Sequence, residues 1–276
     1  MLIDMRCRPP TPPFLAIFKS KVFTRVLQRV GPFGTAPSFE KESVELFLKE
    51  MDEAGVSHAV ITGRNVPLGG IPNEHIAELV AKNPDRLIGI GGIDPTNQVH
   101  QALPEVEKCI KELGMKGISM DPGISSTPMR YDDRRLYPVY ARCAELNVPV
   151  FLLTAAYAGT DLMQTHPKYI EQVAADFPRL NIVCSHGCWP FVMETIGVAC
   201  RRRNIFVSPD LYLFLPGSMP YVEAANFFLK EQFLFASAYP LAPLKASVDA
   251  FKKLPLKPEV MDNLLYKNAQ RVLGLG

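Results

Sequence analysis

Arginine and histidine side chains that could bind an anion and move a proton occur at a few positions of this 276-residue sequence. Arg6 and Arg8 are two residues apart, so in an extended strand their side chains point to the same side. Arg64 lies further along the chain, and His186 directly follows the run Ile-Val-Cys-Ser. Guanidinium groups stay protonated and fork onto carboxylates, whereas imidazole titrates near neutral pH. These residues predict a site for a small carboxylate-bearing substrate.

Further side chains could complete such a site. His186 is the best candidate for proton transfer, and Asp210 is a second candidate as acid, base or orienting group. The substrate-binding candidates are Arg6, Arg8, Arg64, Asp121, Tyr157, Trp189 and Tyr239. The aromatic members could line a pocket for a flat ring, although packing would use them equally well.

A repeated unit, a short apolar run followed by a helical stretch, must position these residues. The runs occur at 2–5, 58–62, 87–93, 117–120, 149–153, 181–185, 204–208 and 232–237. Most begin about 30 residues apart, as expected for β-loop-α units that build a parallel sheet. We therefore expect one α/β domain over residues 1–276, a (β/α)8 TIM barrel. The alternative, a doubly wound open sheet, is disfavoured because no Gly-x-Gly-x-x-Gly follows any run.

The candidate residues follow the apolar runs, and active sites of such barrels lie at the carboxyl ends of the strands. The first connection is too long for a simple loop, and residues 9–39 form a lid-like insertion with an expected helix over Leu15–Val30. A packing insertion or an oligomer contact is an equal alternative for this segment. Further on, a helix is expected over Glu40–Ala54, and Asn73 is expected to cap the next helix.

The composition limits the class of protein. The chain is 47% hydrophobic and its net charge is only +2, with 30 basic and 28 acidic residues. This excludes a disordered chain and gives no general attraction to nucleic acid or to an anionic membrane. Neither a signal peptide nor a long apolar segment is apparent, and the six cysteines form no Cys-x-x-Cys pair. We expect a cytoplasmic protein with reduced thiols, and leave a homo-oligomer open.

Several short motifs, in order along nearly the whole chain, resemble the amidohydrolase superfamily. The resemblance is to its amidohydrolase-related branch, which includes aminocarboxymuconate-semialdehyde decarboxylase. The motifs are Ile-Asp-x-x-x-Arg at 3–8, Pro-Asp-Arg-Leu-Ile-Gly at 84–89, Gly-Met-Lys-Gly-Ile at 114–118, Leu-Asn-Val-Pro-Val-Phe at 146–151, the stretch Phe-Pro-Arg-Leu-Asn-Ile-Val-Cys-Ser-His-Gly at 177–187, Phe-Ala-Ser-Ala-Tyr-Pro at 235–240 and Asn-Ala-Gln-Arg-Val-Leu at 268–273. The resemblance implies the same barrel, with the site at the carboxyl ends of the strands.

The resemblance also implies a divalent metal, which such enzymes hold with histidines after strands one, five and six and an aspartate after strand eight. This chain has Arg6 and Arg8, Thr154 and Ala238 at the other positions, and His186 alone matches. A zinc site needs about three imidazole, thiolate or carboxylate ligands. The usual metal site is therefore predicted to be absent and no cofactor is predicted. A rebuilt zinc site that uses Cys7 or Cys184 stays as the alternative.

These observations predict an enzyme, a hydrolase of lactones or esters or a decarboxylase, that acts on a small carboxylate without the usual metal. The strand-one arginines would stabilise developing negative charge and His186 would transfer a proton. A metal-dependent enzyme with a rebuilt site and a non-catalytic carboxylate-binding barrel are the alternatives. For Arg6 and Arg8, a purely structural role is also open, in which they pair with the acidic residues Asp94, Asp121 or Asp210.

Overall fold

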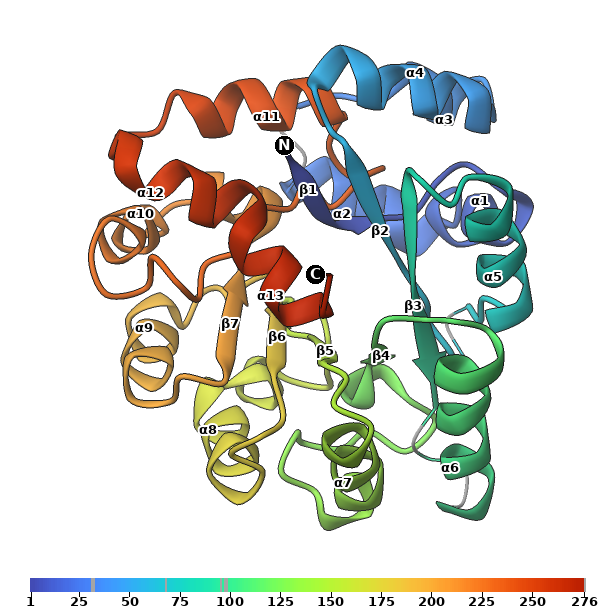
Figure 1. Ribbon diagram of the computed structural model, residues 1–276, viewed down its shortest axis with the longest axis vertical. Helices are drawn as coiled ribbons and strands as arrows, with labels where there is room; N and C mark the ends of the chain where they lie inside the picture. The colour runs from blue at the N-terminus through green and yellow to red at the C-terminus, as the bar shows by residue number, and fades with distance from the viewer. Residues whose placement is uncertain (31–32, 68, 95, 97–98, 276) are drawn as a thin grey trace.

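The computed structural model describes residues 1–30, 33–67, 69–94, 96 and 99–275, and for residues 26–28, 30 and 99 the backbone alone. It forms a barrel of parallel strands (Figure 1). Seven strands are hydrogen-bonded in chain order. They are β1 (Ile3–Cys7), β2 (His58–Thr62), β3 (Leu87–Ile93), β4 (Ile118–Met120), β5 (Val150–Leu153), β6 (Ile182–Ser185) and β7 (Ile205–Ser208). The predicted α/β TIM barrel is thereby confirmed.

The eighth apolar run closes the barrel without forming a regular strand. On one side Leu234 N donates to Val207 O of β7 at 2.9 Å, and on the other Met5 N of β1 donates to Phe235 O at 3.1 Å. Ser237 N donates instead to a carboxylate oxygen of Asp4, at 3.0 Å. The predicted strand over 232–237 is therefore in the predicted place, but a side chain interrupts its backbone ladder.

Helices connect the strands and surround them (Figure 1). They are α1 (Pro12–Phe18), α2 (Lys21–Val30), α3 (Pro37–Glu40), α4 (Val44–Ala54), α5 (Asn73–Lys82), α6 (Val99–Glu107), α7 (Tyr137–Glu145), α8 (Pro167–Asp176), α9 (Val192–Arg201), α10 (Met219–Ala225), α11 (Leu244–Lys252), α12 (Pro258–Asp262) and α13 (Asn268–Leu273). None of the helices in the described residues is long and apolar enough to cross a membrane. All six cysteines are free thiols.

Two local predictions need correction. The single helix expected over Leu15–Val30 is two helices, because Ser20 interrupts it and its hydroxyl accepts from Phe23 N at 3.4 Å, as a helix-capping side chain does. Asn73 is not a cap but the first residue of α5. Its side-chain amide is occupied elsewhere, since it accepts from Gly92 N at 2.8 Å and donates to Gly92 O at 3.1 Å. Asn73 thus ties α5 to the end of β3.

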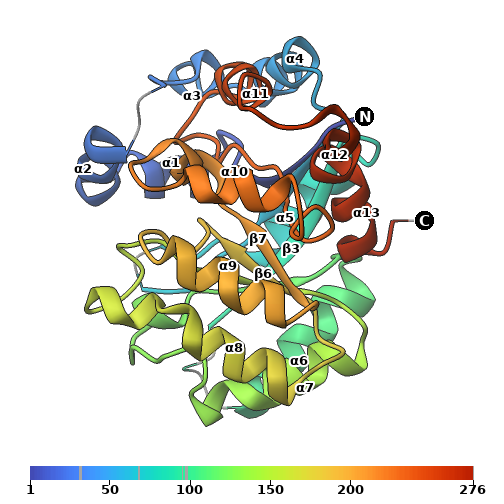
Figure 2. The ribbon, with the colours of Figure 1, turned by 90° about the vertical axis from the view of Figure 1, so that its left-hand side faces the viewer.

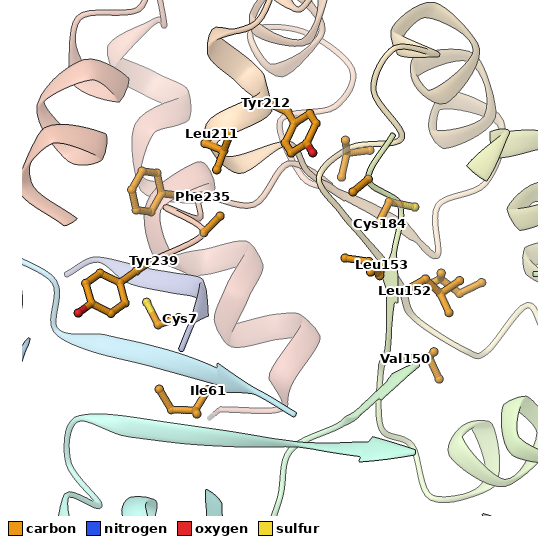
Figure 3. Close-up of a cluster of buried hydrophobic side chains, with 14 of the residues drawn as sticks. Cys7, Ile61, Val150, Leu152, Leu153, Cys184, Leu211, Tyr212, Phe235 and Tyr239 are labelled. Atoms are coloured by element: carbon orange, nitrogen blue, oxygen red, sulfur yellow. The ribbon is translucent and has the colours of Figure 1, made fainter. Parts of the chain in front are cut away.

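Apolar side chains fill both sides of the barrel wall. The inner cluster takes Ile3 and Met5 from β1 with partners from the other strands, and α13 packs against it. The outer cluster lies between strands and helices, and Figure 3 shows part of it, with Tyr239 next to Cys7 where the ring closes. Figure 2 places α2 at one end of the barrel and α13 at the other. The insertion and the carboxyl ends of the strands therefore lie at the end opposite α13.

A bulge in β1 decides which of its side chains enter the barrel. Asp4 pairs with Ala59 and Cys7 pairs with Ile61, so one residue of β1 has no counterpart on β2. Before the bulge, the odd-numbered residues Ile3 and Met5 face inward. After it, Cys7 packs outward, so Arg6 and Arg8 on either side of it can face inward.

Candidate active site

A small cavity at the carboxyl ends of the strands gathers most of the polar residues singled out above. Its volume is about 80 Å³, enough for a small ligand such as a compact carboxylate. Its polar lining consists of Arg6, Arg8, Arg64, Tyr157, His186 and Tyr212. Its apolar lining consists of Val22, Phe23, Ile124, Leu153, Ala155, Ala158 and Leu241. The arrangement suits an anionic group joined to an apolar body.

A larger hollow of about 520 Å³ lies beside α5 and is a poorer candidate for such a ligand. Acidic side chains line it, among them Glu74, Asp94 and Glu105. They would repel a carboxylate, whereas the arginines of the smaller cavity attract one.

Arg64 is positioned by two glycines and a buried ion pair. A Cβ atom at Gly92 would lie 2.4 Å from Arg64 N, and one at Gly63 would lie 2.5 Å from Gly92 N, so only glycine permits this approach of β2 to β3. The Arg64 Nε donates to Asp121 Oδ2 at 2.6 Å, and both side chains are buried. The guanidinium also lies 5.5 Å from the ring centroid of Phe23 in α2. Arg64 is therefore held in place from two sides.

Arg8 is anchored in a similar way but without a carboxylate. Its Nε donates to the Thr62 carbonyl at 3.3 Å, and its guanidinium lies 5.9 Å from the Phe18 ring centroid. Phe18 and Phe23 pack together at 4.9 Å between ring centroids. The insertion thus places an aromatic pair over two of the three arginines.

Arg6 is the least compensated of the three. Its side chain is 3% exposed, and within the described residues its guanidinium makes no hydrogen bond or ion pair. Burial lowers the pKa of Arg6 from its ordinary value, while the charges of Asp210 and Asp121 counteract this. In the described part of the chain neither Arg6 nor Arg8 forms an ion pair, so the structural pairing with Asp94, Asp121 or Asp210 is not what the structure shows.

His186 and Asp210 form a buried pair at the ends of β6 and β7. The Nδ1 atom of His186 lies 2.9 Å from Asp210 Oδ1 and 2.7 Å from Oδ2. Both residues have left-handed backbone, with φ of 71° and 48°, a conformation that costs energy for residues with a Cβ and is common at functional sites. Because Nδ1 is engaged, Nε2 is the nitrogen that can exchange a proton with a ligand in the cavity.

Burial and the arginines set the charge of this pair. Burial lowers the pKa of His186 well below 6.5, and the neighbouring charges of Arg6, Arg8 and Arg64 lower it further. Burial raises the pKa of Asp210 well above 3.8, against the opposing effect of Arg6. The imidazole is therefore neutral at neutral pH and carries one proton, and burial favours a second proton on the carboxyl group of Asp210.

Four of the candidate residues lie outside the cavity lining. Asp121 is behind Arg64 as its ion-pair partner, and Asp210 is behind His186. Trp189 packs on Tyr212 at 6.0 Å between ring centroids, and its Nε1 donates to Pro216 O at 3.0 Å. Tyr239 is buried and its hydroxyl lies 2.7 Å from Ser38 Oγ. These aromatic rings therefore contact protein and not the cavity.

Phe23 and Tyr212 line the cavity although neither is among the sequence candidates. Tyr212 follows the seventh apolar run, and its ring lies 4.9 Å from that of His186. Its place two residues after Asp210 is a signal that could have identified it. Phe23 lies within the 9–39 insertion, where only the length of the segment points to a role.

Relatives of known name match parts of the chain. A 2-amino-3-carboxymuconate-6-semialdehyde decarboxylase from Dictyostelium discoideum is 34% identical over 97 residues, which is 35% of this chain and 25% of that protein. A gamma-resorcylate decarboxylase from Polaromonas sp. is 35% identical over 85 residues, which is 29% of this chain and 26% of that protein. The chain thus spans only about a quarter of the length of these curated relatives in the matched regions.

Solved structures match along the whole chain. An uncharacterized TIM-barrel protein from Bordetella bronchiseptica is 40% identical, with a TM-score of 0.92 over 99% of this chain and 98% of that one. A dihydroxybenzoic acid decarboxylase from Polaromonas sp. is 16% identical, with a TM-score of 0.73 over 99% of this chain and 97% of that one. The second similarity is one of fold.

The prediction of no cofactor requires correction. The Polaromonas decarboxylase of the same fold was solved with bound manganese and an inhibitor, and a 5-carboxyvanillate decarboxylase of this fold also holds manganese. These structures point to a metal cofactor. The residues of this chain do not fit one at the expected place, since the described part brings together no three His, Cys, Asp or Glu side chains that could hold a metal. Neither Cys7 nor Cys184 belongs to such a group in the described part of the chain, so the rebuilt zinc site has no set of ligands there. We therefore assign no chemical step to a metal.

The family model described as amidohydrolase matches residues 34–275, which include every strand after β1 and the position of His186. The barrel and the place of the cavity agree with the expectations drawn from the sequence motifs. The chain therefore belongs to the amidohydrolase family.

Proposed function

We propose that the protein is an enzyme of the carboxy-lyase type that removes CO2 from a small carboxylate attached to a flat, unsaturated or aromatic body. The observation that carries this proposal is the cavity itself, in which three arginines and His186 face an apolar wall. The names of the relatives support the reaction type, since two of them are decarboxylases of unsaturated or aromatic acids. Hydrolysis of a lactone or ester is the alternative, because its oxyanion would meet the same arginines.

The arginines would bind and orient the substrate. A buried guanidinium binds a carboxylate by a fork of two N–H groups, and fixed orientation removes much of the entropy cost of reaction. The apolar lining from Phe23, Ile124 and Leu241 would hold the body of the substrate and exclude water. The same positive charges would stabilise the negative charge that develops when the C–C bond to the carboxyl group breaks.

His186 would supply the proton that replaces CO2. When the C–C bond breaks, its electron pair stays on the substrate carbon and takes a proton from Nε2. A second proton, held between Asp210 and Nδ1, can move onto Nδ1 at the same time, because the two side chains are 2.7–2.9 Å apart, and solvent then returns a proton to Asp210. The imidazole then stays neutral throughout, as the three nearby arginines require.

Turnover of a panel of aromatic carboxylates, among them 2,6-dihydroxybenzoate, tests the proposal, with CO2 release measured with and without added manganese. We expect His186→Ala to lower the rate of an accepted substrate by at least about 100-fold, the usual range for loss of an acid–base group. The control is His166→Ala, because His166 caps α8 through Lys168 N, packs its ring on Phe191 and lies outside the cavity. Unchanged turnover in His186→Ala would show that the proton comes from elsewhere. Binding without consumption of any panel member would favour a carboxylate receptor.

A further inference from the structure

We infer that the ligand of this cavity carries two carboxylates and binds as a dianion, one carboxylate to Arg6 and one to Arg8. The inference rests on the proposed function, because it takes the cavity to be the substrate site. It goes further by specifying the charge of the substrate and which groups recognise each end.

Charge compensation is the first argument. Three guanidinium groups share a cavity of about 80 Å³, and all three residues are at most 5% exposed. Among the described residues Asp121 compensates Arg64, while Arg6 and Arg8 have no carboxylate at ion-pairing distance. Burying an uncompensated charge costs several kcal/mol, so a ligand that supplies two negative charges would complete the site.

Hydrogen-bonding capacity is the second argument. A terminal nitrogen of each arginine (Arg6 Nη2, Arg8 Nη2 and Arg64 Nη1) is buried and has no partner within the described residues. Buried donors in native proteins are almost always paired. A single carboxylate has two oxygens and forks well onto one guanidinium, so one such group leaves the other arginine incomplete.

The anchoring of the arginines is the third argument. Arg8 is fixed at the Thr62 carbonyl and the Phe18 ring. Arg6 lies in the bulge of β1 and Arg8 directly after the end of that strand, on the two sides of Cys7. The two guanidinium groups therefore start from different points of the chain, and their like charges hold them apart. Acceptors are therefore needed at two separated points.

Asp210 does not supply the missing charge. Its carboxyl group is hydrogen-bonded to His186 Nδ1 at 2.9 Å, and it is buried outside the cavity lining. Burial also raises the pKa of Asp210, which reduces the negative charge that it carries near neutral pH. The compensation must come from the ligand.

Isothermal titration of the protein with pairs of ligands of equal shape tests the inference. The pairs are fumarate with its monoamide fumaramate and isophthalate with 3-carbamoylbenzoate, in which a neutral amide replaces one carboxylate. We expect a dicarboxylate to bind at least tenfold more tightly than its monoamide. In Arg6→Gln, and separately in Arg8→Gln, this difference should fall below threefold. Inorganic phosphate, a dianion without two separated ends, should bind more weakly than the preferred dicarboxylate.

Each contrary result has a distinct meaning. Equal binding of dicarboxylates and monoamides, or equally tight binding of phosphate, would overturn the inference. If benzoate-type monocarboxylates bind and are consumed as well as dicarboxylates, the inference fails and the proposed function stands. If no carboxylate of either kind binds, both fail. Retention of the tenfold difference in both arginine variants would also overturn it, since the second charge would then be recognised elsewhere.

Discussion

Replacing Asp121 by Asn should destabilise the protein strongly, because this carboxylate compensates the buried charge of Arg64, which lies in the same cavity as Arg6 and Arg8. The Arg64–Asp121 pair has a 2.6 Å contact, and its two side chains are only 3% and 2% exposed. Removing one partner of a buried pair costs about 3–5 kcal/mol. Repulsion from Arg6 and Arg8 adds to this cost, so we expect a loss of about 4 kcal/mol or more, equivalent to a fall in Tm of roughly 10 °C.

Guanidinium chloride unfolding followed by fluorescence measures this loss, since Trp189 is the single tryptophan and packs on Tyr212 beside the cavity. Asp133→Asn is the matched control. The Arg135–Asp133 pair also has a contact of 2.7 Å, but its side chains are 56% and 26% exposed. An exposed pair contributes about 0–1 kcal/mol, so the control should differ little from the parent protein.

The two variants separate burial from mere pairing. If Asp121→Asn loses less than about 1 kcal/mol, like the control, the compensation argument is refuted. The effect of an added anion on Tm is a second readout. Asp121→Asn removes the ion-pair partner of Arg64, so the guanidinium of Arg64 can bind the anion instead. Phosphate or a dicarboxylate should therefore raise the Tm of this variant by more than it raises that of the parent protein.

Three further predictions concern neighbouring residues. Burial raises the pKa of Asp4 from 3.8 to about 6, so protonation of Asp4 favours the folded state. This stabilisation of about 3 kcal/mol is present below pH 4 and is lost as the pH rises through 6. Unfolding titrations at several pH values should show that Asp4→Asn abolishes this part of the pH dependence. Arg6→Met should raise the free energy of unfolding of the unliganded protein by about 1 kcal/mol or more, seen as a higher Tm, while carboxylate binding weakens over tenfold. A lower Tm would mean that the charge of Arg6 is compensated in the folded protein. Gly92→Ala would place a Cβ 2.4 Å from Arg64 N and should lower both Tm and carboxylate affinity, whereas Gly197→Ala, a helical position with open space, should raise Tm slightly.

The barrel could be predicted because its signals are local and repeated. Apolar runs at regular spacing indicate parallel strands, and the strand-end rule then brings residues as distant in sequence as Arg6 and His186 to one cavity. The irregular eighth position could not be predicted in the same way. Its apolar pattern is that of a strand, but the Asp4 carboxylate binds Ser237 N across the chain ends, which no local pattern reveals.

The directions of individual side chains were less predictable than their positions. Trp189 and Tyr239 follow strands as active-site residues do, yet Pro216 O and Ser38 Oγ bind their polar atoms away from the cavity. Ser38 is 201 residues from Tyr239, so this partner cannot be inferred from neighbouring sequence. Phe23 approaches Arg64 only because of how the 9–39 insertion folds back over the barrel. Interactions between distant segments decide such details.

The bulge in β1 makes the character of the cavity depend on how one short strand pairs with its neighbour. If β1 paired residue for residue with β2, without the bulge, strict alternation from Ile3 onward would turn the thiol of Cys7 inward and Arg6 and Arg8 toward the surrounding helices. The same barrel would then present a nearly neutral pocket, and two cations would lie in the apolar layer outside it. Gain or loss of a bulge at this strand is consequently a route by which relatives could exchange one ligand chemistry for another without altering a residue type.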